Sequence, residues 1–237
     1  MNFVILRIMK KINDKIIFVF LFSLLGLIAL KVPVSRIVGS GQSFSFFDFF
    51  APTVAMFLGA LPGAISVLLV KLFDLIFISR KIEAVSLLRL LPLPLAAFYF
   101  GSKSKKRSLI AIICIILFIV HPVGRQAWVY SLYWLIPIFA CFFPKRLFLK
   151  SLGSTFTAHA VGSTIFLYAF QLPTAVWKGL IPVVFVERVG FALGIYLSYF
   201  VFNVSLNFLL RVLRFEKLYF LVKKEYLPSW KFLLRYS

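Results

Sequence analysis

The side chains that can do chemistry in this chain lie within or beside long apolar stretches, where charge is costly. Ionisable groups placed in hydrocarbon usually mark a binding site or a transport pathway. When the apolar stretches are threaded through a bilayer, these groups fall near one face, opposite the basic loops. We therefore expect a polar site near the outer face that binds a solute. The residues concerned are Asp48, Asp74, His121, Arg125, Gln126, Glu187 and Arg188.

The most suggestive stretch is HPVGRQAW, which runs from His121 to Trp128. Its Pro and Gly predict a turn, Arg125 offers a planar donor fork for a carboxylate or phosphate, and Gln126 adds an amide. Trp128 and Trp134 on the following helix are expected to stack on a flat ligand. The alternative is an interfacial turn beside an aromatic belt. A belt alone does not require Arg and Gln together, so both interpretations stay open.

The adjacent pair Glu187 and Arg188 lies well inside the last apolar run. Neighbouring residues point to different sides of a helix, so each is expected to find a partner elsewhere. Glu187 is predicted to meet Arg125, and Arg188 to meet Asp74 or Asp48. Each contact is either a structural clasp or part of the binding site.

Two further polar positions have simpler structural explanations. Lys71 lies three residues before Asp74, which predicts a local ion pair on one helix. His159 lies among Ser, Thr and Gly residues in mid-membrane, where hydrogen-bonded packing is favoured over ligand binding. The sequence has no motif for metal hydrolysis, for a serine nucleophile or for a phosphate loop. We therefore predict no enzymatic activity, no catalytic residue, no metal and no cofactor.

Composition identifies the class of protein. Of the 237 residues, 62% are hydrophobic and 14% are charged, and the mean hydropathy is +1.01. A soluble domain has too little polar surface to cover so much apolar side chain, and a β-barrel would alternate in short segments. The formal charge of +20 lies mainly in loops and tails, which indicates the positive-inside rule and anionic lipid, not nucleic acid.

The apolar runs predict an all-α, polytopic membrane bundle of six to eight spans over residues 1–210, with both termini cytoplasmic. The count depends on residues 46–79, which are interrupted at Leu61-Pro62-Gly63 and either cross twice or form a re-entrant pair. Residues 175–210 are expected to hold a short outer element and then one long helix. Residues 211–237 form a basic-aromatic tail, predicted to lie as a helix on anionic lipid at the inner interface.

Small residues recur every four positions at Ala51, Ala55, Gly59 and Gly63. On a single helix this spacing lines small side chains along one face and lets helix backbones approach closely in lipid. The face either packs inside the bundle or contacts a separate membrane protein.

In these features the chain resembles the substrate-binding S component of energy-coupling-factor (ECF) vitamin transporters. The resemblance rests on the size, the hydrophobicity, the cytoplasmic termini, and the Gly/Pro/Ala-rich stretch from Phe50 to Ile65 followed by Asp74. It implies a vitamin-like solute bound near the outer face, and a coupling subunit driven by two ATPases. It also makes the stripe from Ala51 to Gly63 a candidate face for that subunit.

The sequence therefore predicts a solute-binding subunit for micronutrient uptake in the prokaryotic plasma membrane. One alternative is a membrane sensor or scaffold domain that acts through protein contacts. A second alternative is a small lipid-modifying membrane enzyme, although no motif points to one.

Overall fold

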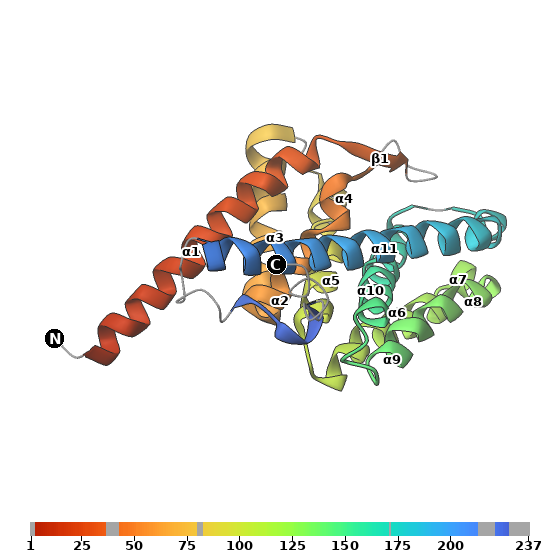
Figure 1. The fold of residues 1–237 in the computed structure, drawn as a ribbon. Helices are drawn as coiled ribbons and strands as arrows, with labels where there is room; N and C mark the ends of the chain where they lie inside the picture. Colours follow the sequence, from red (N-terminus) through yellow and green to blue (C-terminus); the bar gives the residue numbers. More distant parts are fainter. Residues whose placement is uncertain (1–2, 37–42, 80–82, 171, 213–220, 228–237) are drawn as a thin grey trace.

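The computed structural model describes residues 3–36, 43–79, 83–170, 172–212 and 221–227 (Figure 1). The described chain is 84% helical, which confirms the all-α class. Among these residues, three helical stretches are long and apolar enough to cross a membrane: residues 60–79, 84–101 and 174–212. Shorter apolar helices cover residues 16–30 and 128–140. The protein is therefore a helical membrane protein.

The N-terminal half begins with one long helix and a small hairpin. Its strands pair antiparallel, and the Phe46 N–H donates to the Val32 carbonyl at 2.8 Å at the base of the hairpin, next to α1. The elements are α1 (Phe3–Leu30), β1 (Pro33–Arg36), β2 (Ser43–Ser45), two 3₁₀ turns (Phe46–Phe49 and Ala51–Thr53), α2 (Val54–Leu58), α3 (Ala60–Phe73) with a π-helical extension (Asp74–Ser79), α4 (Ala84–Leu88) and α5 (Pro92–Gly101).

The C-terminal half contains two long helices and a series of short ones. The central helix α10 contacts α5, α6, α9 and α11, so it forms the middle of the bundle. The elements are a 3₁₀ turn (Lys105–Ser108), α6 (Leu109–Val120), α7 (Pro122–Gln126), α8 (Trp128–Ser131), a second 3₁₀ turn (Leu132–Trp134), α9 (Leu135–Ala140), α10 (Leu147–Ala169), α11 (Thr174–Val212) and a final 3₁₀ turn (Lys224–Tyr226).

The chain breaks within residues 46–79 at a different place from the predicted one. Gly59 has a φ of 103°, a backbone conformation that favours glycine, and it separates α2 from α3. Pro62 lies in the first turn of α3, where proline is tolerated because the first N–H groups of a helix have no partner. The first part of the block therefore consists of short, mostly buried turns, and the second part is one continuous helix.

The last helix, α11, also differs from the prediction. It runs for 39 residues without interruption, with Pro182 inside it, so no separate outer element precedes it. At 1.5 Å per residue it is about 58 Å long, which greatly exceeds the roughly 30 Å of bilayer hydrocarbon. Figure 1 shows α11 running across the view to the right-hand end of the molecule, and it packs against α10.

The small-residue stripe is not one helix face. Ala51 belongs to a 3₁₀ turn, Ala55 to α2 and Gly63 to α3, with the Gly59 break between the last two. Ala51 and Ala55 are buried, and Gly63 packs so closely on Ala55 that an added Cβ would lie 2.7 Å from the Ala55 backbone nitrogen. The prediction of a partner interface at these residues was wrong, because they hold α2, α3 and α5 together.

Part of the C-terminal tail lies within the described residues and docks on α11. Asn203 is buried; its side-chain amide donates to the Lys223 carbonyl at 3.0 Å and its oxygen accepts from the Lys223 N–H at 2.9 Å. Tyr226 packs edge-on against Tyr199, with ring centroids 5.6 Å apart. Burial, together with the charge of Glu225, raises the pKa of Tyr226 to about 12. Residues 221–227 contain only a short 3₁₀ turn; the rest of the predicted interfacial helix lies outside the described residues.

We expect Asn203→Leu to release this docked segment. The variant removes two hydrogen bonds worth about 1 kcal/mol each, so the segment should open roughly 30-fold more often. Trypsin cleavage after Lys223 and Lys224 in detergent, followed by mass spectrometry, measures the change. Ser205→Leu, at an exposed position on the same helix, is the control and should leave the cleavage rate as in the wild type. Equal cleavage of the two variants would contradict a clasp at Asn203.

Candidate functional site: a polar cavity inside the bundle

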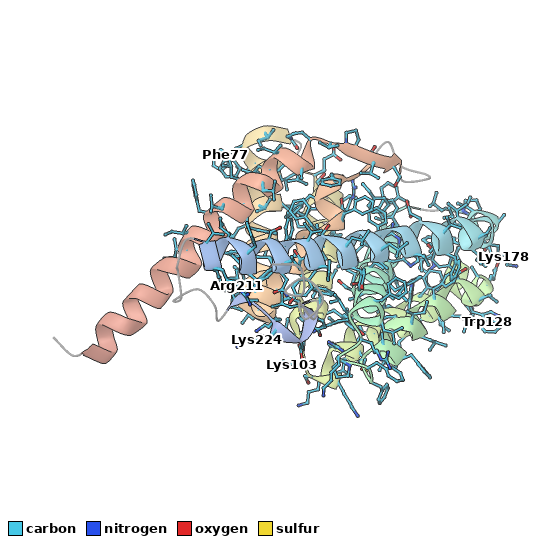
Figure 2. All side chains as sticks on the ribbon, in the orientation of Figure 1. Phe77, Lys103, Trp128, Lys178, Arg211 and Lys224 are labelled. Carbon is cyan, nitrogen blue, oxygen red and sulfur yellow. The ribbon has the colours of Figure 1, made fainter. Side chains whose placement is uncertain are left out.

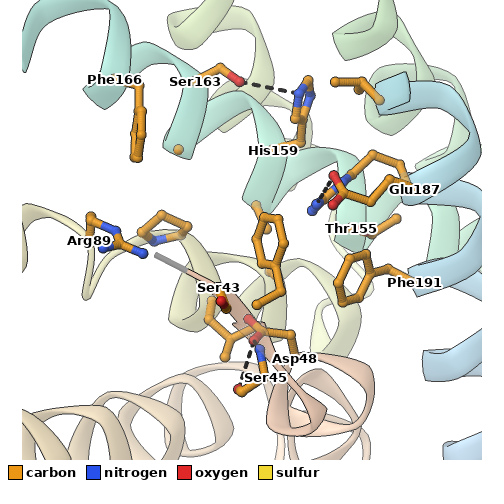
Figure 3. A pocket seen from close by; sticks show the side chains of 18 of the residues that line it. Ser43, Ser45, Asp48, Arg89, Thr155, His159, Ser163, Phe166, Glu187 and Phe191 are labelled. Atoms are coloured by element: carbon orange, nitrogen blue, oxygen red, sulfur yellow. Dashed lines mark hydrogen bonds and ion pairs between the residues drawn. The ribbon is translucent and has the colours of Figure 1, made fainter. Parts of the chain in front are cut away.

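A cavity of about 720 Å³ lies between the hairpin, the α3–α5 region and helices α10 and α11. Figure 3 shows that Arg89 and Glu187 point into it from opposite sides, with His159 and Ser163 from α10 and with Asp48 and Ser45 from the hairpin end. Ligand sites of this size are usually largely apolar with a few polar groups. Six charged side chains line this cavity, although charge is costly inside a membrane protein: Asp48, Lys71, Asp74, Arg89, Glu187 and Arg188.

One wall carries the pair Glu187 and Arg188. The Arg188 Nη2 donates to the Glu187 carboxylate at 2.7 Å, and the Ser35 hydroxyl donates to the same carboxylate at 3.0 Å. The Arg188 guanidinium packs against the rings of Phe44 and Phe191, 4.5 Å and 4.6 Å from their centroids, and the two rings also contact each other. These two rings hold the long side chain so that it folds back to its sequence neighbour.

The predicted partners of this pair were therefore wrong. Glu187 does not meet Arg125, and Arg188 meets neither Asp74 nor Asp48 within ion-pair distance among the described residues. The prediction considered only the directions of the two Cβ atoms. It left out the reach of the arginine side chain and the aromatic rings that orient it.

The other two cavity carboxylates have local partners. Asp74 accepts from Lys31 at 2.6 Å and from the Ser79 hydroxyl at 2.8 Å. Asp48 accepts from both the N–H and the hydroxyl of Ser45, at 2.8 Å and 2.9 Å. The predicted pair between Lys71 and Asp74 was wrong, because Lys31 on α1 occupies that carboxylate.

Arg89 is a cavity residue that the sequence analysis did not single out. It lies between α4 and α5, its guanidinium carbon is 5.9 Å from the Phe166 ring centroid, and it lines the cavity together with Lys71. Neither cation has an ion-pair partner among the residues that the structure describes. The available signal was an arginine inside an apolar stretch, the criterion that selected Arg188.

His159 belongs to a buried hydrogen-bond network on the α10 wall. The Trp134 Nε1 donates to its Nδ1 at 3.1 Å, while its Nε2 lies 2.8 Å from the Tyr130 hydroxyl and 3.2 Å from that of Ser163. Because an indole N–H can only donate, Nδ1 accepts and the neutral ring carries its proton on Nε2. The predicted packing role describes the Trp134 side of the ring, but Tyr130, His159 and Ser163 also line the cavity.

The HPVGRQ turn lies outside this cavity. Its His121 caps α7 by accepting from the Val123 N–H at 3.3 Å, and Gln126 accepts from the Thr174 hydroxyl at 3.1 Å. Arg125 is exposed, and Trp128 is 52% exposed at one end of the molecule, as Figure 2 shows.

The structure therefore divides the predicted ligand-binding residues into two groups. Trp134 is fully buried and contacts His159, so it supports the cavity wall without lining it. Of the predicted set, Asp74, Glu187 and Arg188 line the cavity, whereas His121, Arg125, Gln126, Trp128 and Trp134 do not.

The chemistry of this arrangement is recognition by charge and hydrogen bonding. Among the described residues, no group of three or more His, Cys, Asp or Glu side chains is placed to hold a metal ion. The fold and the cavity define a helical membrane protein with a charged interior site. No protein-family model matches the chain, and neither a curated protein nor a solved structure was found to match it.

Proposed function

We propose that this chain is a solute-binding membrane subunit for the uptake of a micronutrient-like small molecule in a prokaryotic plasma membrane. The supporting observation is the cavity of about 720 Å³, lined by charged side chains from both halves of the chain. A membrane protein that only packed helices would have no reason to keep so many charges around an open space. The site of binding is this cavity and not the HPVGRQ turn.

The topology belongs to the same proposal. Both termini are cytoplasmic, and the bundle crosses six to eight times. The convergence of basic zones supports this orientation, because Lys103, Arg107 and Lys223 all lie within electrostatic range of Lys150. In Figure 2, Lys103 and Lys224 project from the lower edge of the molecule, away from Phe77 and Trp128.

A separate coupling subunit and two ATPases complete the proposed system, as the ECF resemblance implies. The stripe from Ala51 to Gly63 is not available for the coupling subunit, because most of it is buried. Any coupling contact must use another part of the surface.

The test is to fill the cavity with a side chain. Gly162 lines it, and an added Cβ would lie 3.8 Å from Pro92 Cγ, an ordinary contact, so Gly162→Leu can fold while its side chain occupies the space. Gly190→Leu is the matched control, because a Cβ there meets nothing within 4 Å and Gly190 does not line the cavity.

We expect the detergent-purified wild type to carry a bound small molecule, which mass spectrometry detects after it is released. Gly162→Leu should carry at least about tenfold less of this molecule per mole of protein. Gly190→Leu and Arg125→Ala should retain as much as the wild type. If Arg125→Ala lost the bound molecule while Gly162→Leu kept it, the binding site would be the HPVGRQ turn. If Gly162→Leu carried as much of the small molecule as the wild type, the cavity would not be the binding site.

A further inference from the structure

The hydrogen-bonding groups around the cavity are unbalanced, with acceptors occupied and donors free. Each of the three lining carboxylates already accepts at least two hydrogen bonds from the protein. The side chains of Arg89 and Lys71 on this lining carry only donors, and neither has an ion-pair partner among the described residues. A solute that fits must supply acceptors.

The charges are unbalanced in the same direction. Asp74 is neutralised by Lys31 and Glu187 by Arg188. Asp48 is then the one remaining carboxylate on the lining, and Arg89 and Lys71 are the two remaining cations. Both cations lie close enough to Asp48 to interact with its charge. Arginine keeps its charge in proteins, so the Arg89 side is cationic and lacks an ion-pair partner among the described residues. One negative charge on the solute offsets this excess.

Part of the remaining lining is aromatic. Phe44 and Phe191 hold Arg188 in place, while Phe166 lies beneath Arg89. Aromatic rings of this kind pack against a planar organic group. The cavity thus offers a cationic end near Arg89 and an aromatic wall beside it.

We infer that the solute is a soluble organic anion whose carboxylate or phosphate oxygens are bound by Arg89 and Lys71. This inference rests on the proposed function and names the chemical class of the solute. Arg188 stays paired with Glu187 through its Nη2, so Arg89 and Lys71 are the cations left for the solute. The guanidinium of Arg89 suits an oxyanion because it presents its donors in a planar fork.

The experiment separates small molecules by charge before they meet the protein. The aqueous small-molecule extract of yeast is passed over an anion exchanger at pH 7, which gives a retained anionic fraction and an unretained fraction. Each is added to the full chain in detergent, and the melting temperature is measured. We expect the retained fraction to raise it by roughly 5 °C in the wild type and in Gly190→Leu. Gly162→Leu should not respond.

The double variant Arg89→Gln/Lys71→Gln tests the residues that bind the oxyanion. We expect it to need at least about tenfold more of the retained fraction for the same shift. Glutamine keeps hydrogen bonding and approximate size, so a lost response reports the charge. An unaltered response in a folded double variant would overturn the assignment of these two residues.

The remaining outcomes distinguish the inference from the function on which it rests. Stabilisation by the unretained fraction alone would overturn the anionic class while leaving solute binding intact. Stabilisation by neither fraction would overturn both. Phosphatidylglycerol micelles are tested in place of the two fractions. If these micelles stabilised the wild type but not Gly162→Leu, and neither fraction did so, the oxyanion would be that of a lipid headgroup. The assignment of a soluble solute would then be wrong.

Discussion

Gly63→Ala is expected to destabilise the fold by about 3 kcal/mol or more, because the added methyl group has no room. The new Cβ would lie 2.7 Å from the Ala55 backbone nitrogen and 2.5 Å from the Ala55 Cβ. Backbone atoms cannot rotate aside as a flexible side chain can, so α2 and α3 must separate. We expect the purified variant to melt several degrees lower in detergent, or to lose its single peak in size-exclusion chromatography.

The matched control is Gly190→Ala, which adds the same methyl group to a helix where nothing lies within 4 Å. Alanine is the better helix former by about 1 kcal/mol, so this variant should melt at or slightly above the wild-type temperature. If Gly63→Ala had the same melting temperature as Gly190→Ala, α2 and α3 would not pack as closely at Gly63 as described.

Arg188→Met is expected to cost roughly 3–5 kcal/mol, because it leaves Glu187 as a partly buried charge without its cation. The Glu187 side chain is 23% exposed and keeps only the Ser35 hydroxyl as a partner. Methionine retains much of the apolar contact with Phe44 and Phe191, so the loss is mainly electrostatic. Thermal melting of the detergent-purified variant measures it.

The double variant Glu187→Gln/Arg188→Met supplies the control for this prediction. Glutamine removes the charge but still accepts a hydrogen bond from Ser35, so about half or more of the lost stability should return. If the double variant were less stable than Arg188→Met, the interaction between the two residues would not be an ion pair.

The class of protein and much of the polar cluster follow from the sequence. Continuous apolar runs predict membrane helices, and the cost of charge in hydrocarbon indicates which polar residues to examine. Asp48, Asp74, Glu187 and Arg188 were selected in this way, and all four line the cavity. His121, Arg125 and Gln126, which were placed at the same face by the same criterion, do not line it, so depth in the membrane alone did not define the site.

The HPVGRQ turn was selected for its residue types, and residue type alone does not say which way a helix faces. In a soluble protein the polar face of a helix points to water, but a membrane helix is apolar on both its lipid side and its buried side. Periodicity therefore did not separate Arg125, which is exposed, from Arg89, which faces the cavity.

The break at Gly59 was missed for a different reason. Pro62 and Gly63 are the stronger sequence signals for a helix end. Proline, however, is compatible with the first turn of a helix, and Gly63 is required by the close contact with Ala55. The backbone angle that ends α2 depends on Gly59, which stands out in the sequence only as one of the small residues spaced four apart.

Helix α11 joins two distant features through one continuous rod. Arg188 lies at the cavity wall and Asn203 holds residues 221–227, with fifteen residues or about 22 Å of helix between them. Its proline, Pro182, precedes both, so no hinge of that kind separates them. A displacement of the helix at the cavity is therefore carried to the docked segment through unbroken α-helix.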